Sequence, residues 1–114
     1  MNIVIISGNL TRDAELKITA NSKSVLNFTI ANSIGFGQNK SAQFFRCNLW
    51  GDRATKLAEH LTKGKGVIVT GEIQLREYEK DGEKKISPEI FVGNIEFMGG
   101  GKKQDADDDA PPLF

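Results

Sequence analysis

Cysteine and histidine are nearly absent from this chain, which holds one residue of each, Cys47 and His60. A single cysteine excludes an intrachain disulfide, and two such ligands are too few for a structural zinc site. The pair also does not supply the nucleophile, base and orienting group that covalent catalysis requires. We therefore expect no metal site, no cofactor and no enzymatic activity.

Long hydrophobic runs are lacking as well. No apolar stretch approaches the roughly 20 residues that a membrane-spanning helix requires. Residues 1–7 lack the basic segment of a secretory signal, and their apolar run is too short for one. These absences predict a soluble protein of a reducing, intracellular compartment.

Net charge is absent too, because fifteen Lys and Arg balance fifteen Asp and Glu. The balance hides an asymmetry along the chain. All fifteen bases lie at or before Lys103, and four of the acids lie between Asp105 and Asp109. Residues 1–104 therefore carry a charge of +4 and the last ten residues carry −4. Such an asymmetry indicates a polyanionic partner for residues 1–104 and a basic partner for the last ten residues.

The sequence does contain a series of short apolar runs with the two-residue period of β-strands. Within the body, residues 1–98, the expected strands cover about 3–6, 25–31, 43–50, 67–78 and 84–97. An Asp-Gly pair at 81–82 predicts a tight hairpin turn between the last two strands. Pro88 and Gly93 predict bends or bulges in the final strand.

One segment has helical rather than strand spacing. Asp52 is the expected N-cap, and residues 54, 57, 58 and 61 place apolar side chains at helical intervals before Lys63 and Gly64 end the helix. The order of three strands, a helix and two strands is that of an OB-fold, which binds oligonucleotides or oligosaccharides on one face. The sequence thus predicts an all-β domain with one helix, an OB-fold five-stranded barrel. Other small barrels share this order and stay open as alternatives.

The strand expected at 43–50 connects the fold with a function. Because side chains alternate along a strand, one face carries Gln43, Phe45, Cys47 and Leu49. The opposite face carries Phe44, Arg46, Asn48 and Trp50. A guanidinium and an amide between two aromatic rings would be costly to bury unpaired, so this face suits bases stacking on rings and a cation meeting phosphate. The alternative is that the rings are half-buried at the barrel rim and Arg46 is a solvated charge.

Further candidates for nucleic-acid binding lie outside that strand. Arg76 and Tyr78 share the polar face of the strand expected at 67–78, at the base of the hairpin. Phe36 stands between two glycines in a loop, where a folded core has no use for an aromatic ring. Lys17 and Lys63 are candidate phosphate contacts, with ordinary solvated lysines as the alternative.

The C-terminal segment, residues 99–114, differs in composition from the body. Three glycines open it, and four aspartates precede two prolines, a leucine and a phenylalanine. We expect a disordered acidic tail, because the segment has almost no apolar surface to bury. Its apolar, carboxylate-bearing tip suits a basic-rimmed pocket on another protein; the alternative is a tail that only adds solubility. The expected partner-binding residues are Asp107, Asp108, Asp109, Pro112, Leu113 and Phe114.

Several segments together resemble the bacterial-type single-stranded DNA-binding proteins, including phage and plasmid forms. The similar segments are residues 5–16, 43–51, 57–64 and 67–73, together with the acidic run that ends in Pro and Phe. The family usually carries Trp at the positions of Phe36, Phe44 and Tyr78, and Phe where Trp50 stands. The smaller rings imply weaker or differently ordered stacking. At the tip, Leu113 separates the last proline from the terminal Phe.

The resemblance implies an OB-fold that assembles as a homotetramer and wraps single-stranded DNA independently of sequence. It implies a role in replication, recombination and repair, with replication and repair proteins recruited through the tail, in the bacterial cytoplasm or nucleoid. It places the stacking aromatics at Phe36, Phe44, Trp50 and Tyr78. The alternative class is an OB-fold assembly or protein-interaction module, in which DNA binding is weak or indirect.

Overall fold

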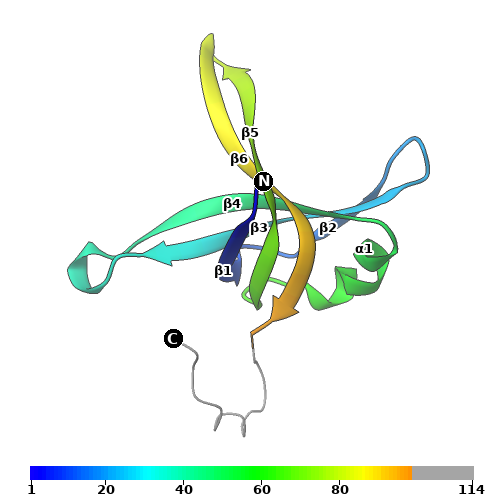
Figure 1. Ribbon diagram of the computed structural model, residues 1–114, viewed down its shortest axis with the longest axis horizontal. Helices are drawn as coiled ribbons and strands as arrows, with labels where there is room; N and C mark the ends of the chain where they lie inside the picture. The colour runs from blue at the N-terminus through cyan, green and yellow to red at the C-terminus, as the bar shows by residue number, and fades with distance from the viewer. Residues whose placement is uncertain (99–114) are drawn as a thin grey trace, which may run out of the picture.

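The computed structural model describes residues 1–98, so the whole predicted tail, residues 99–114, lies outside the described residues. The strands are β1 (Val4–Leu10), β2 (Glu15–Ile18), β3 (Ser24–Ile34), β4 (Ser41–Trp50), β5 (Gly66–Lys80) and β6 (Glu83–Phe97). The helical elements are the α-helix α1 (Asp52–Leu57) and two 3₁₀ turns, η1 (Gly37–Asn39) and η2 (Ala58–His60). Figure 1 shows the strands crossing at the centre and two long hairpins leaving the barrel.

Five of the strands form a ring. β1 pairs antiparallel with both β3 and β5, β5 pairs with β6, and β3 pairs with β4. The ring closes where β4 and β6 run parallel for three residue pairs, from Arg46 opposite Glu89 to Asn48 opposite Phe91. This is the five-stranded arrangement of an OB-fold, and it confirms the predicted fold class for the described residues.

β2 is a strand that the sequence analysis did not predict. It pairs with β3 outside the ring, and all four of its residues are exposed. Its apolar side chains, Leu16 and Ile18, remain 40% and 62% exposed. Glu15, Leu16, Lys17 and Ile18 do alternate polar and apolar side chains, but the alternation covers only four residues and none of them is buried.

The barrel interior holds the apolar face of each strand. The predicted alternation along β4 is confirmed, because Cys47 and Leu49 are buried while Phe44 and Trp50 are exposed. Leu61, which follows η2, is fully buried in the same cluster. The other buried members of the cluster are Leu10, Leu26, Phe28, Ile30, Ala54, Val67, Val69 and Ile90.

The helix begins and ends differently from the prediction. Its N-cap is Gly51 and not Asp52, and Gly51 has φ 98°, a conformation that favours glycine. Asp52 is instead the first helical residue, where its carboxylate interacts favourably with the helix dipole. Regular α-helix stops at Leu57, and a 3₁₀ turn continues to His60.

The hairpin of β5 and β6 extends beyond the barrel, and residues 74–86 are all exposed. Its turn has positive φ at both Asp81 and Gly82, as the Asp-Gly signal predicted. Gly93 is the extra residue of a β-bulge, because Thr70 pairs with Asn94 while the next residue of β5 pairs with Val92. The ladder continues through Pro88 without a register shift, so the bulge predicted there is absent from the described strands.

Candidate nucleic-acid interface

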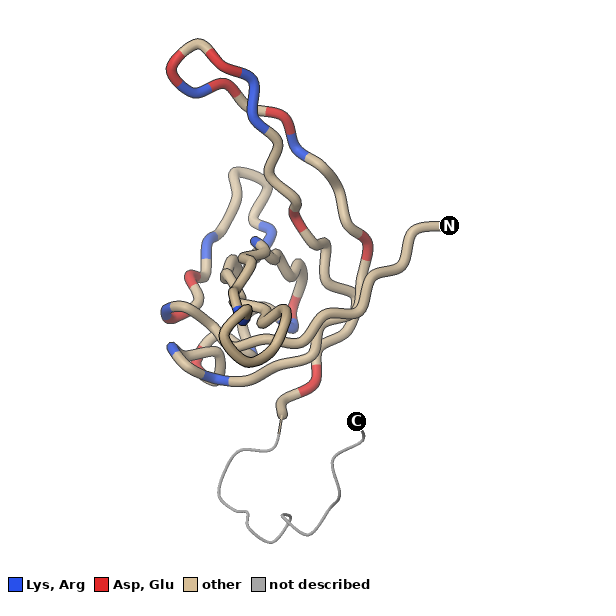
Figure 2. The backbone as a smooth tube through the Cα atoms, turned by 90° about the vertical axis from the view of Figure 1, so that its left-hand side faces the viewer, with Lys and Arg blue, Asp and Glu red and all other residues tan. Residues whose placement is uncertain are grey.

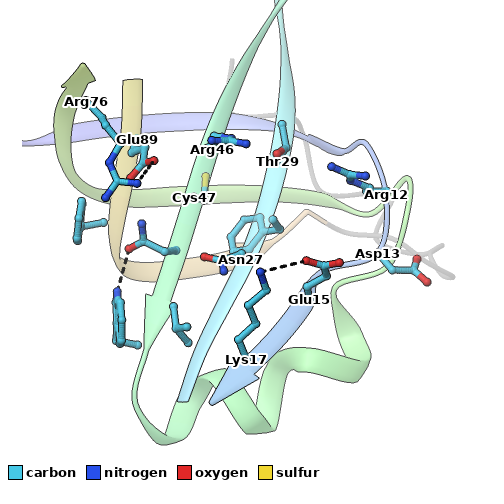
Figure 3. A pocket seen from close by; sticks show the side chains of 15 residues that line it. Arg12, Asp13, Glu15, Lys17, Asn27, Thr29, Arg46, Cys47, Arg76 and Glu89 are labelled. Atoms are coloured by element: carbon cyan, nitrogen blue, oxygen red, sulfur yellow. Dashed lines mark hydrogen bonds and ion pairs between the residues drawn. The ribbon is translucent and has the colours of Figure 1, made fainter. Parts of the chain in front are cut away.

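An open groove of about 470 Å³ crosses the outer face of the barrel, on the side opposite the buried residues of β4 (Figure 3). The loop between β1 and β2 borders it at one end, and Arg76 of β5 borders it at the other. The lining residues whose side chains lie on this outer side are Arg12, Asp13, Glu15, Lys17, Val25, Asn27, Thr29, Arg46, Asn48, Trp50, Arg76, Glu89 and Phe91. This surface is called the groove below.

Two rows of side chains cross the strands at the floor of the groove. Residues that pair across neighbouring strands project from the same side of the sheet. One row consists of Thr29, Arg46 and Glu89. The other row consists of Asn27, Asn48 and Phe91. Each row joins β3, β4 and β6, so the closure of the ring is what assembles the floor.

Four of the residues predicted from the sequence to bind nucleic acid lie together in the groove: Lys17, Arg46, Trp50 and Arg76. Trp50 is 46% exposed, and its indole Nε1 donates a hydrogen bond of 3.2 Å to Asn48 Oδ1. This bond holds the ring beside the groove floor with part of its surface open to a ligand. Three members of the alternating set of the sequence analysis, Arg46, Asn48 and Trp50, therefore line one surface.

The other three predicted aromatic residues lie outside the groove. Phe44 is 60% exposed on β4, two residues from Arg46 on the same face. Phe36 is 85% exposed in the segment between β3 and η1, and Tyr78 is exposed on the hairpin. Both of these segments project from the barrel in Figure 1. These rings could extend a binding surface beyond the groove, but the structure does not gather them into it.

Lys63 is also absent from the groove lining. Its backbone N–H donates a hydrogen bond of 2.8 Å to Asp13 Oδ1, which ties the segment after η2 to the loop between β1 and β2. Asp13 lines the groove, so Lys63 lies next to one end of it. The structure thus brings Lys63 near the groove without placing it inside.

Ion pairs neutralise some of the cations in the groove. Lys17 Nζ lies 3.9 Å from Glu15 Oε1, and Arg76 Nη1 lies 3.4 Å from Glu89 Oε2 (Figure 3). Within residues 1–98, Arg46 makes no ion pair. Arg46 is therefore the cation at the centre of the groove that is most available to a phosphate.

The hairpin does not act as a basic arm. Figure 2 shows both signs of charge interspersed at its tip. From Arg76 to Lys85 the segment has four basic and four acidic residues and hence no net charge. Attraction of a polyanion must therefore depend on individual cations at the groove rather than on a uniformly positive hairpin.

The sequence analysis did not predict eight of these lining residues: Arg12, Asp13, Glu15, Val25, Asn27, Thr29, Glu89 and Phe91. Arg12 lies in the loop between β1 and β2, and Asn27 of β3 lies opposite Asn48 of β4. Glu89 and Phe91 had a local signal, because they share one face of β6 while Ile90, which lies between them, is on the other face. That signal was ambiguous without the parallel pairing that places this face beside Arg46 and Asn48.

Cys47 lies beneath the groove floor and is 2% exposed. Burial raises the pKa of its thiol to about 12, so the group stays protonated and is a poor nucleophile at neutral pH. Among residues 1–98, no three His, Cys, Asp or Glu side chains gather in a way that could hold a metal ion. No helix in the same range has the length and apolarity needed to cross a membrane.

Comparisons with known proteins identify relatives of the chain. The family model described as the single-strand binding protein family matches residues 1–98. A single-stranded DNA-binding protein of Mycobacterium leprae is 40% identical over 100 residues, which cover 81% of this chain and 60% of that protein. One of Borreliella burgdorferi is 34% identical over 117 residues, covering 94% of this chain and 78% of that protein. The chain spans about 60% of the length of the mycobacterial relatives it matches.

Proposed function

Since the chain belongs to the single-strand binding protein family, we propose that its groove binds single-stranded DNA independently of sequence. The observation that carries this proposal is the outer face of β4, where Phe44 and Trp50 are exposed on either side of Arg46. Each base stacked on such a ring contributes roughly 1–3 kcal/mol and can be any base. The family and the named relatives are binding proteins and not enzymes.

Single strands are preferred over duplex because stacking on side chains needs bases that are free of their partners. Trp50 and Phe44 bind bases, and Phe36 and Tyr78 continue the stacking surface on the two projecting hairpins. Arg46 is the main phosphate contact. Lys17, Lys63 and Arg76 add weaker contacts, since Lys17 and Arg76 already have carboxylate partners.

A fluorescence titration tests this function directly, because Trp50 is the only tryptophan of the chain. An unstructured oligonucleotide should quench Trp50 emission in a saturable manner, and a duplex of the same length should quench it little at equal concentration. Equal responses to the two ligands, or none to either, would contradict the proposal. The second result would favour an OB-fold that serves mainly in protein interaction.

We also propose that the chain acts as a homotetramer. Ile3, just before β1, and Ile5, on the outer face of β1, are 64% and 66% exposed, and the partly buried Ile68 of β5 lies on the same face as Ile5. Exposed apolar side chains on a sheet are frequent sites of association, so further copies of the chain would cover them. DNA could then pass over several barrels, at about 4–16 nucleotides for each.

Because the composition changes between residues 1–98 and residues 99–114, we propose a different role for each segment. Residues 1–98 bind DNA, and residues 99–114 recruit replication and repair proteins in the bacterial cytoplasm or nucleoid. Phe114 is the anchor of this tail, because an aromatic ring that follows a run of carboxylates fits an apolar pocket with a basic rim. The acidic residues Asp107, Asp108 and Asp109 add attraction to such a rim.

A further inference from the structure

Glu89 is the one buried charged residue among residues 1–98, with 8% of its surface exposed. It lies on β6 at the floor of the groove, beside Arg46 in the parallel pairing and opposite Gln74 in the antiparallel one. A carboxylate in this position is unexpected for a surface that binds a polyanion. Burial of a charged group is also costly unless that group is well paired.

The hydrogen bonding of Glu89 is incomplete. An ionised carboxylate has two oxygens that can each accept two hydrogen bonds. Its Oε2 receives a single bond from Arg76 Nη1 at 3.4 Å, which is long for a charge-assisted bond, and Oε1 accepts none from residues 1–98. Buried acceptors in folded proteins are normally satisfied. Glu89 therefore retains acceptor capacity at the groove floor.

The surroundings of Glu89 favour a base over a phosphate as the missing partner. A carboxylate repels a phosphate, whereas the neighbouring Arg46 attracts one. Phe91 is two residues away on the same face of β6 and also lines the groove. Two residues of a strand span about 6.7 Å, which is comparable to the width of a base. A base stacked near Phe91 can thus bring its edge to Glu89 while its phosphate stays at Arg46.

We propose that Glu89 is a specificity-determining residue that accepts a hydrogen bond from the exocyclic amino group of a base bound in the groove. The proposal rests on the function proposed above and refines it, because binding then tolerates every sequence but is not indifferent to the base at this position. Cytosine offers its N4 amino group as a donor, whereas thymine has the O4 acceptor at the same place. A carboxylate favours the first and repels the second.

The test compares two pyrimidine homopolymers, which stack little on themselves and differ at the edge that Glu89 would contact. Binding of the full chain to labelled oligo-dC and oligo-dT of equal length is measured by fluorescence anisotropy at mildly alkaline pH. The readout is the ratio of the two Kd values, dT over dC. Because other groove contacts influence both Kd values, the change of this ratio between variants carries the information.

Glu89→Gln is the informative variant, since an amide can accept from cytosine and donate to thymine without a charge preference. We expect the ratio to fall by roughly fivefold or more relative to the parent chain. Glu15→Gln is the matched control, because it removes the same charge from an exposed carboxylate of the same groove. It should strengthen binding of both oligomers by a similar factor and leave the ratio unchanged.

A chemically modified oligonucleotide tests the same hydrogen bond with the parent chain, so the test stays valid even if Glu89→Gln does not fold. Oligomers of N4,N4-dimethylcytosine, which lack the amino hydrogens, should bind the parent chain roughly fivefold or more weakly than oligo-dC. Equal ratios in all three proteins, or equal binding of the methylated and unmethylated oligomers, would overturn the role of Glu89 while leaving the proposed function intact. Absence of binding to every oligomer would overturn the proposed function itself.

Discussion

Within the groove, some side chains offer rings on which bases can stack, and others offer positive charge. Trp50 offers a ring that a hydrogen bond to Asn48 holds in place, and Arg46 offers a guanidinium that no carboxylate within residues 1–98 neutralises. Arg76, by contrast, is occupied by Glu89. Arg46 should therefore have a larger electrostatic effect on DNA binding than Arg76.

Replacing Arg46 by Ala should weaken binding to single-stranded DNA and flatten its dependence on salt. Each neutralised phosphate adds about 0.7 to the slope of log affinity against log salt concentration on single strands. The slope for Arg46→Ala should thus be smaller by roughly 0.7. Lys56→Ala, which removes an equal charge from the exposed side of α1, is the control and should leave the slope unchanged. Parallel slopes for the parent chain and Arg46→Ala would mean that Arg46 contacts no phosphate.

The buried thiol of Cys47 should make the folded protein sensitive to alkaline pH. Burial raises the pKa of this thiol from 9.0 to about 12, so the folded state holds its proton more tightly than the unfolded state. The resulting stabilisation is fully present below about pH 9 and is lost as the pH rises from 9 towards 12.

Urea denaturation at a series of pH values checks this expectation. Above pH 9, the free energy of unfolding of the parent chain should fall more steeply than that of Cys47→Ala, by up to about 1.4 kcal/mol per pH unit. In the folded protein the thiol should also resist thiol reagents that modify it readily after unfolding. Equal pH slopes for the two proteins would contradict the assignment.

Elements show where sequence reasoning was sufficient and where it was not. The two-residue period of β4 predicted both its buried and its exposed face, because alternation is fixed by the backbone of one strand. The existence of β2 depends on pairing with β3, and the place of Glu89 depends on the parallel pairing of β6 with β4. The pairing of β6 with β4 has no local signature, since its partners lie far apart in sequence. β2 and β3 are instead neighbours along the chain and form a hairpin, in which Ile18 lies opposite Ser24. The helix cap was misplaced by one residue for a related reason: Asp52 is a good capping residue, but Gly51 adopts the backbone conformation of the turn.

The bulge between β5 and β6 contains two glycines, Gly71 and Gly93, that differ in the space a Cβ atom would have. A Cβ atom on Gly71 would lie 2.0 Å from the carbonyl oxygen of Phe91, whereas the contact nearest to a Cβ on Gly93 is Thr70 O at 3.6 Å. We expect Gly71→Ala to destabilise the fold by roughly 1–3 kcal/mol, and Gly93→Ala to do so much less. Thermal unfolding followed by circular dichroism measures both. Similar melting temperatures for the two variants would show that the close approach of β5 to β6 relaxes easily.

The whole molecule leaves several large apolar side chains exposed, and Ile5 on the outer face of β1 is one of them. A stable tetramer should appear in light scattering as a mass well above the 12.5 kDa of one chain. Ile5→Lys should lower that mass, because it places a charge in the proposed interface. Ile18→Lys on β2 is a matched control, since Ile18 is similarly exposed but lies on a different element. A monomeric parent chain, or an Ile5→Lys protein of unchanged mass, would contradict the proposed assembly.

The closure of the ring also bears on how fast the chain can reach its native state. The pairs that close it join residues 46–48 to residues 89–91, and β1 must meet both β3 and β5, so the fold is completed by segments far apart along the chain. Ordering the intervening chain costs entropy before these pairs can form. Domains with such topology refold in milliseconds to seconds rather than in microseconds. A newly made chain therefore passes through a period in which its strand edges are unpaired, and within that period neighbouring copies can associate in non-native ways.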